Sequence, residues 1–85
     1  MIPGFIEIDR HRFYEEIWPR IRSFADSMES NWEEVHRCKK ARIPAPELYI
    51  YWGYKDPQTD EKIILAVTTA SPDRERHWIS PRLNI

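Results

Sequence analysis

The chain has 85 residues and a formal net charge of -1, with 13 Lys and Arg against 14 Asp and Glu. A chain of this length forms one hydrophobic core rather than two, so we expect a single domain, residues 1–85. The balanced charge excludes a general electrostatic attraction to nucleic acid, which needs an excess of positive charge. The lone Cys38 cannot form an internal disulfide, and no signal peptide or membrane span is recognisable, so we expect a cytoplasmic protein.

A short strand at Phe5–Ile8 is the first predicted element. The segment is rich in apolar and β-branched residues and is followed by Asp9, a residue type that caps helices. Beyond it, apolar residues recur at steps of three and four, which is the spacing of one stripe along a helix. The residues of this stripe are Phe13, Ile17, Ile21, Phe24, Met28, Trp32 and Val35.

We expect the helical region to run from about Arg10 to Lys40, with two features that interrupt it. Pro19 lacks a backbone N–H and collides with the preceding turn, so it predicts a kink. Ser30 and Glu33 have the spacing of a capping box, at which a second helix can begin. Because the stripe keeps its phase across both positions, the sequence favours one kinked helical region, and a break near Ser30 is the alternative.

Three strands are predicted after the helical region, which two closely spaced prolines end. Glu47–Tyr54 and Lys62–Thr69 are rich in residues typical of strands, and the polar segment between them has the composition of a turn. A second turn leads to Arg74–Ser80. The predicted fold class is therefore α+β: a short N-terminal strand, a kinked or broken helical region, and a three-stranded antiparallel β-meander packed on the helix.

Both faces of this meander carry apolar side chains, because successive residues of a strand point to opposite faces. One face holds Leu48, Ile50, Trp52 and Tyr54, and the other holds Tyr49 and Tyr51. One helical layer covers only one face, so we expect the face with Tyr49 and Tyr51 to stay uncovered. The alternatives are a helical region that breaks near Ser30 and wraps both faces, or tyrosines that lie flat with their hydroxyls in water.

An uncovered face of this composition predicts a binding surface, since Tyr, Trp and Arg dominate the energetics of protein interfaces. The candidate partner-binding residues are Tyr49, Tyr51, Arg74, Arg76, His77, Trp78 and Arg82. We therefore expect a small non-catalytic protein-binding module, such as a regulator, adaptor or inhibitor. Its partner is another protein or a second copy of itself, and no cofactor, metal or membrane is expected.

Two alternatives remain at the level of sequence. The last strand carries Arg76, His77 and Trp78, whose side chains can respectively bind a phosphate, transfer a proton and stack on a base. Asp73 and Glu75 nearly cancel the local positive charge, so a nucleic-acid partner is possible but not favoured. The order of strand, helical segment and meander resembles that of RelE/ParE-type toxins, which implies a small ribonuclease; no sequence motif accompanies this resemblance. The second alternative is a structural subunit of a homo-oligomer, whose spare face a neighbouring copy covers.

Overall fold

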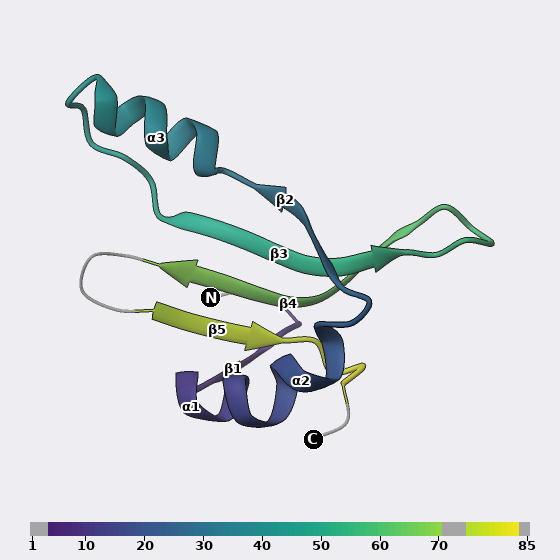
Figure 1. The fold of residues 1–85 in the computed structure, drawn as a ribbon. Coiled ribbons are helices and arrows are strands. Elements are labelled where there is room, and N and C mark those ends of the chain that lie inside the picture. Colours follow the sequence, from purple (N-terminus) through teal and green to yellow (C-terminus); the bar gives the residue numbers. More distant parts are fainter. Residues whose placement is uncertain (1–3, 71–74, 84–85) are drawn as a thin grey trace.

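The structure is a computed structural model, and it describes residues 4–70 and 75–83. Within these residues, five antiparallel strands form one sheet with the order β1-β5-β4-β3-β2 (Figure 1). The strands are β1 (Ile6–Ile8), β2 (Asp26–Ser30), β3 (Leu48–Lys55), β4 (Lys62–Ala70) and β5 (Glu75–Ile79). The helices are α1 (Arg10–Arg12), the π-helical η1 (Phe13–Ile17), α2 (Trp18–Ile21) and α3 (Trp32–Lys40).

The α+β class is confirmed, whereas the prediction of three sheet strands is wrong in number. The predicted meander is present as β3, β4 and β5, which are successive neighbours in the sheet. The N-terminal strand β1 extends it by pairing with β5, and β2 extends it at the other edge by pairing with β3. None of the helices in the described residues is long and apolar enough for a membrane crossing.

The favoured single helical region from Arg10 to Lys40 is wrong, because β2 separates two helical segments; the alternative, a break near Ser30, is closer to the structure. In β2, Asp26 lies opposite Gly53 of β3 and Ser27 lies opposite Trp52. This pairing with a distant strand overrides the local helical pattern, as tertiary contacts commonly do. The apolar stripe is accordingly interrupted after Ile21: Phe24 is 49% exposed and Trp32 is 56% exposed, and Val35, which is buried, belongs to the separate helix α3.

The first helical segment combines α1, η1 and α2 in one continuous run. The Asp9 carboxylate caps it by accepting a hydrogen bond of 2.8 Å from the backbone N–H of Arg12. In η1 the N–H of Trp18 bonds to the carbonyl of Phe13, five residues back, and Pro19 follows directly. Prolines and π-helical turns both bend helices. The π-helical turn ends two residues before Pro19, the residue at which the sequence predicts a kink.

The second helical segment, α3, begins near the predicted break at Ser30. The residue before it, Asn31, makes no side-chain cap. Its amide instead bonds to the carbonyl of Glu47 and accepts a hydrogen bond of 2.6 Å from the N–H of Tyr49. Asn31 thus ties the beginning of α3 to the beginning of β3, and Figure 1 shows the helix beside that end of the strand.

Side-chain alternation divides the sheet into two faces. Ile50 lies opposite Thr68, which lies opposite His77 in β5, and the ring of Phe13 from η1 stacks on His77. We call this side the helix face; its central residues are Ile50, Trp52, Ala66, Thr68, His77 and Ile79. We call the opposite side the tyrosine face; it consists of Tyr49, Tyr51, Val67, Thr69, Arg76 and Trp78.

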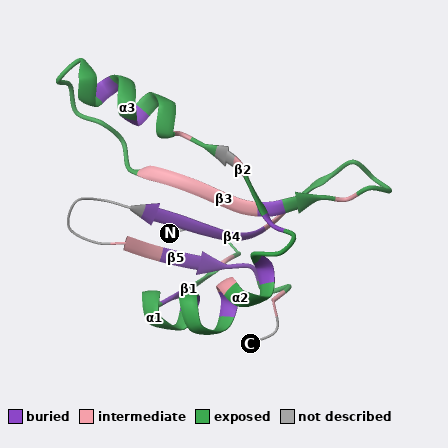
Figure 2. Cartoon of the chain, in the orientation of Figure 1, coloured by how far each residue is buried: buried purple, intermediate pink, exposed green. Residues whose placement is uncertain are grey.

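The hydrophobic core lies between the helix face and the first helical segment. Phe13, Ile17 and Ile21 are buried there against Ala66 and Ile79 of the sheet. Figure 2 shows that buried residues concentrate in β4 and β5, two of the three inner strands, whereas α3 is largely exposed. The first three residues of the predicted stripe therefore pack the first helical segment against the helix face, as the spacing predicts.

One glycine is required by close packing inside the sheet. The register between β3 and β4 shifts between Trp52 and Gly53. A Cβ atom at Gly53 would lie only 2.0 Å from the carbonyl oxygen of Ile63. The backbone of β4 therefore approaches Gly53 more closely than any other residue type would allow.

Candidate functional site

The candidate residues named from the sequence do not form one surface. Tyr49, Tyr51, Arg76 and Trp78 lie on the tyrosine face, whereas His77 lies on the helix face. Arg82 follows β5 and is exposed, and Arg74 lies outside the described residues. Because the sheet separates His77 from Arg76 and Trp78, these three side chains do not converge on one ligand.

Arg76 is engaged within the chain. Its guanidinium donates two hydrogen bonds of 2.9 Å to the carboxylate of Glu7 in β1, and it lies 4.7 Å from the ring centroid of Trp78. Trp78 itself is 2% exposed. The fork-shaped pairing with Glu7 occupies Arg76 much as a phosphate would, and a buried Trp78 offers no face for a base.

Tyr49 and Tyr51 are half-buried and occupy alternate positions of β3 on the tyrosine face. The Tyr49 hydroxyl donates to the carboxylate of Glu47 at 3.3 Å. Burial of the ring, together with the Glu47 carboxylate, raises the pKa of Tyr49. Both effects favour the protonated hydroxyl, so Tyr49 presents a neutral aromatic group with a polar end.

His77 forms the centre of a buried polar network on the helix face, and its side chain is 0% exposed. Its Nδ1 lies 3.0 Å from the hydroxyl of Thr68, and its Nε2 lies 2.8 Å from the carboxylate of Glu75. When the imidazole is neutral, Nε2–H donates to Glu75 and Nδ1 accepts from Thr68. The ring of Phe13 stacks on it at a centroid distance of 4.1 Å.

Glu75 is the anionic member of this network. Burial by itself raises the pKa of Glu75, but hydrogen bonds and positive charge from His77 and Arg10 outweigh it and hold the pKa below its ordinary value. Arg10 contacts the carboxylate from the solvent side at 2.9 Å. Burial and the Glu75 charge in turn raise the pKa of the neighbouring Tyr14. At neutral pH, Glu75 is therefore a carboxylate beside a protonated phenol.

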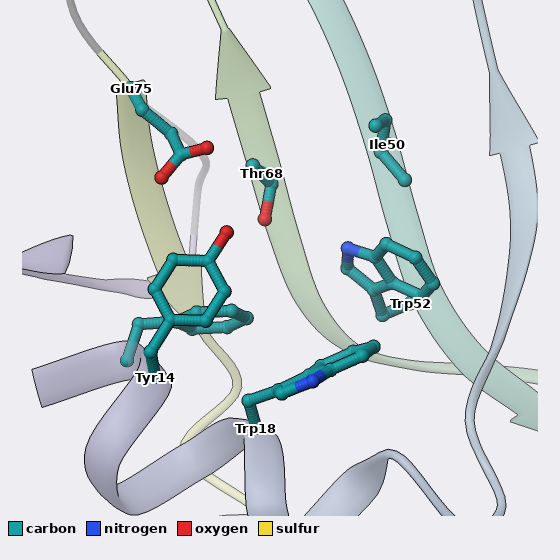
Figure 3. Close-up of a pocket in the computed structure, with 7 residues that line it drawn as sticks. Tyr14, Trp18, Ile50, Trp52, Thr68 and Glu75 are labelled. Carbon is teal, nitrogen blue, oxygen red and sulfur yellow. The ribbon is translucent and has the colours of Figure 1, made fainter. Parts of the chain in front are cut away.

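A pocket of about 180 Å³ adjoins this network on the helix face. Trp18 of α2 and Trp52 of β3 meet there edge to face, with ring centroids 5.1 Å apart. Figure 3 shows the Tyr14 hydroxyl pointing toward Thr68 and Glu75, with the two indole rings on the other side of the space. The lining residues are Phe13, Tyr14, Trp18, Ile50, Trp52, Thr68 and Glu75.

The pocket was not among the features predicted from the sequence. One signal was present: the residues directly after Phe13 and Ile17 in the apolar stripe are Tyr14 and Trp18, both aromatic. Aromatic residues next to the buried stripe make the apolar side of the helix wider than the part that packs on the sheet, and so indicate additional apolar surface. The contact between Trp18 and Trp52 could not be predicted from the sequence, because it depends on how α2 packs on β3.

Comparisons with known proteins return nothing: no family model, no curated protein and no solved structure matches the chain. The resemblance to RelE/ParE-type toxins rests on the predicted order of elements. The observed order differs from it, because β2 lies between the two helical segments. The protein is therefore a small α+β domain with an aromatic pocket on the helix face of its sheet and two half-buried tyrosines on the tyrosine face.

We expect Glu75→Gln to lower the free energy of unfolding at pH 7 by about 1 to 2 kcal/mol, since it weakens charge-assisted hydrogen bonds at a partly exposed site. The folded pKa of Glu75 is below its ordinary value of 4.5, so this stabilisation is complete above that pH and is lost as the pH falls through the folded value. Urea denaturation of both proteins at pH 7 and at pH 3 measures the effect.

The exposed residue Glu61 provides the control for this experiment. Glu61→Gln is expected to change stability little at either pH. A difference between Glu75→Gln and the original protein that stays constant or grows on acidification would contradict the ionised network around His77.

Proposed function

We propose that the protein is a small binding module that acts without catalysis, as a regulator, adaptor or inhibitor, and that it binds another protein through the tyrosine face. One observation carries the proposal. Tyr49 and Tyr51 remain half-exposed on a face whose inner neighbours Val67, Thr69 and Trp78 are buried, while the first helical segment packs on the opposite side.

The chemistry of this surface suits protein recognition. A tyrosine supplies a large contact area with only two rotatable side-chain bonds, so little conformational entropy is lost on binding. Beside the tyrosines, the hydrogen bonds that Arg76 donates to Glu7 and its contact with the ring of Trp78 hold Arg76 in one position. A surface that is ordered before binding loses less freedom in the complex, which favours affinity.

The test is a double substitution of Tyr49→Ser and Tyr51→Ser. We expect the circular dichroism spectrum to persist, because both side chains are only half-buried, and we expect binding to be lost. Two measurements report binding: the molecular mass in solution by analytical ultracentrifugation, and the proteins recovered by affinity purification from the source cells.

Tyr54→Ser is the matched control, since Tyr54 belongs to the same strand but is exposed and contacts Phe24 instead. It is expected to leave both measurements unchanged. A homodimer that the double substitution converts to a monomer would identify a second copy of the chain as the partner. A double variant with unchanged mass and unchanged partners would refute the proposal.

A further inference from the structure

The pocket on the helix face has the dimensions of a site for a small chemical group. Its volume of about 180 Å³ lies below the range of roughly 300 to 1,000 Å³ that is typical of sites for drug-sized ligands and cofactors. Residues from η1, α2, β3, β4 and β5 line it, so its walls belong to helices and strands of the fold rather than to loops. Such a pocket accepts a group of a few heavy atoms in a fixed position.

The walls of the pocket are mainly aromatic. Tyr14, Trp18 and Trp52 approach the space from different directions (Figure 3). The faces of aromatic rings carry negative partial charge and attract cations, with tryptophan the strongest. Tyr14 already makes such a contact within the chain, because the guanidinium of Arg10 lies 5.6 Å from its ring centroid.

The polar groups of the pocket favour the same sign of charge. The carboxylate of Glu75 lines one end, beside the hydroxyl of Thr68. Arg10 partly offsets the carboxylate, but its side chain is 71% exposed and water screens its charge. The other partner of Glu75, His77, lies behind the wall, where its Nε2 is 2.8 Å from the carboxylate. A neutral apolar occupant would desolvate the carboxylate without compensating it.

We propose that this pocket binds a trimethylammonium group. Three aromatic walls surround the methyl groups of such a cation, and Glu75 faces its charge. A primary ammonium is less suitable, because it is strongly hydrated and the lining side chains offer few hydrogen-bond acceptors to replace that water. The site lies on the opposite side of the sheet from Tyr49 and Tyr51, so it is independent of the proposed protein-binding surface.

The first test compares choline with 3,3-dimethylbutan-1-ol, its neutral isostere, in titrations monitored by the indole N–H signals of the ¹⁵N-labelled protein. We expect choline to shift the Trp18 and Trp52 signals in a saturable manner, and the neutral compound to bind about tenfold more weakly. Equal affinity of the two compounds, or no saturable binding of choline, would overturn the proposal.

The second test removes one wall. Trp52→Leu keeps an apolar side chain on β3 but removes the ring, and it is expected to weaken choline binding about tenfold. Trp32→Leu is the matched control, because Trp32 is exposed on α3 outside the pocket, and it is expected to bind choline normally. Undiminished binding by a folded Trp52→Leu variant would contradict the aromatic site.

Two further arms identify the source of the group and separate the two proposals. If the natural ligand is a trimethylated lysine of another protein, a peptide that contains trimethyllysine should bind more tightly than choline. If the ligand is a small free compound, the peptide should bind no more tightly than choline. Either result supports the pocket as the binding site. The Tyr49→Ser and Tyr51→Ser variant should bind choline normally. Its failure to bind choline while folded would show that the two surfaces are not independent, and would overturn the assignment to this pocket.

Discussion

Gly53→Ala is expected to destabilise the fold by about 3 kcal/mol, an effect at the upper end of what overpacking causes. The added Cβ would lie 2.0 Å from the carbonyl oxygen and 2.9 Å from the carbonyl carbon of Ile63. Both atoms belong to the backbone of β4, so they cannot move aside as a flexible side chain would. Relief of the contact requires separation of β3 and β4 at the point where their register shifts.

Urea denaturation measures this loss, and the second described glycine provides the control. Gly4 has a φ of 79°, and no atom lies within 4 Å of a Cβ built there. Gly4→Ala therefore costs only the strain of a left-handed backbone, about 1 kcal/mol. If Gly53→Ala were no more destabilising than Gly4→Ala, the close approach of the two strands would be wrong.

The second large effect is expected for His77→Ala, with a loss of about 3 kcal/mol or more. The substitution leaves a cavity beneath the ring of Phe13 and removes a hydrogen-bond partner of Thr68 and of Glu75, of which Glu75 keeps Arg10. Cavity formation and unpaired buried polar groups each cost a few kcal/mol. For a domain of 85 residues, whose total stability is roughly 4 to 13 kcal/mol, this is a substantial fraction.

His11 and His36 are both exposed and serve as controls; replacement of either by alanine should change stability by less than about 0.5 kcal/mol. A His77→Ala variant as stable as these would contradict the buried network. The result also matters for a ribonuclease assay. Loss of RNA cleavage in a His77→Ala variant would be uninformative without a measurement of folding, since His77 is part of the core.

The meander could be predicted because its signals are local. The segments Glu47–Tyr54 and Lys62–Thr69 correspond to β3, which is shifted by one residue at both ends, and to β4, which is one residue longer. Long runs of β-branched and aromatic residues on either side of a polar turn specify such a hairpin with little help from the rest of the chain. The alternation that places Tyr49 and Tyr51 on the same face follows from the same local geometry.

The strand β2 could not be predicted because its own sequence is polar. Asp26, Ser27 and Ser30 have low strand propensity, while Phe24 and Trp32 on either side continue the spacing of the helical stripe by coincidence. What makes the segment a strand is its partner, since it completes the hydrogen bonding of one side of β3. The paired residues of β3 lie 20 to 27 positions farther along the chain.

The two proposed binding surfaces could be predicted only in part from the sequence, for a related reason. Alternation assigns Trp78 to the tyrosine face but says nothing of its burial, and it does not reveal that Arg76 is held by Glu7 at the far end of the chain. The pocket joins Tyr14, Trp52 and Glu75 from three separate regions. Sites of this kind depend on how elements pack, and no single segment carries their pattern.

The polar character of β2 has a consequence for how the molecule meets others. This strand forms one border of the sheet, with a register shift between Ser27 and Ser30, and the other border, β1, is only 3 residues long. Charged residues, irregular pairing and short length are the features by which natural sheets avoid recruiting foreign strands. Neither border is suited to continuing the backbone ladder into a fibril or a neighbouring chain. Association is therefore left to the side chains that project from the two broad sides of the sheet.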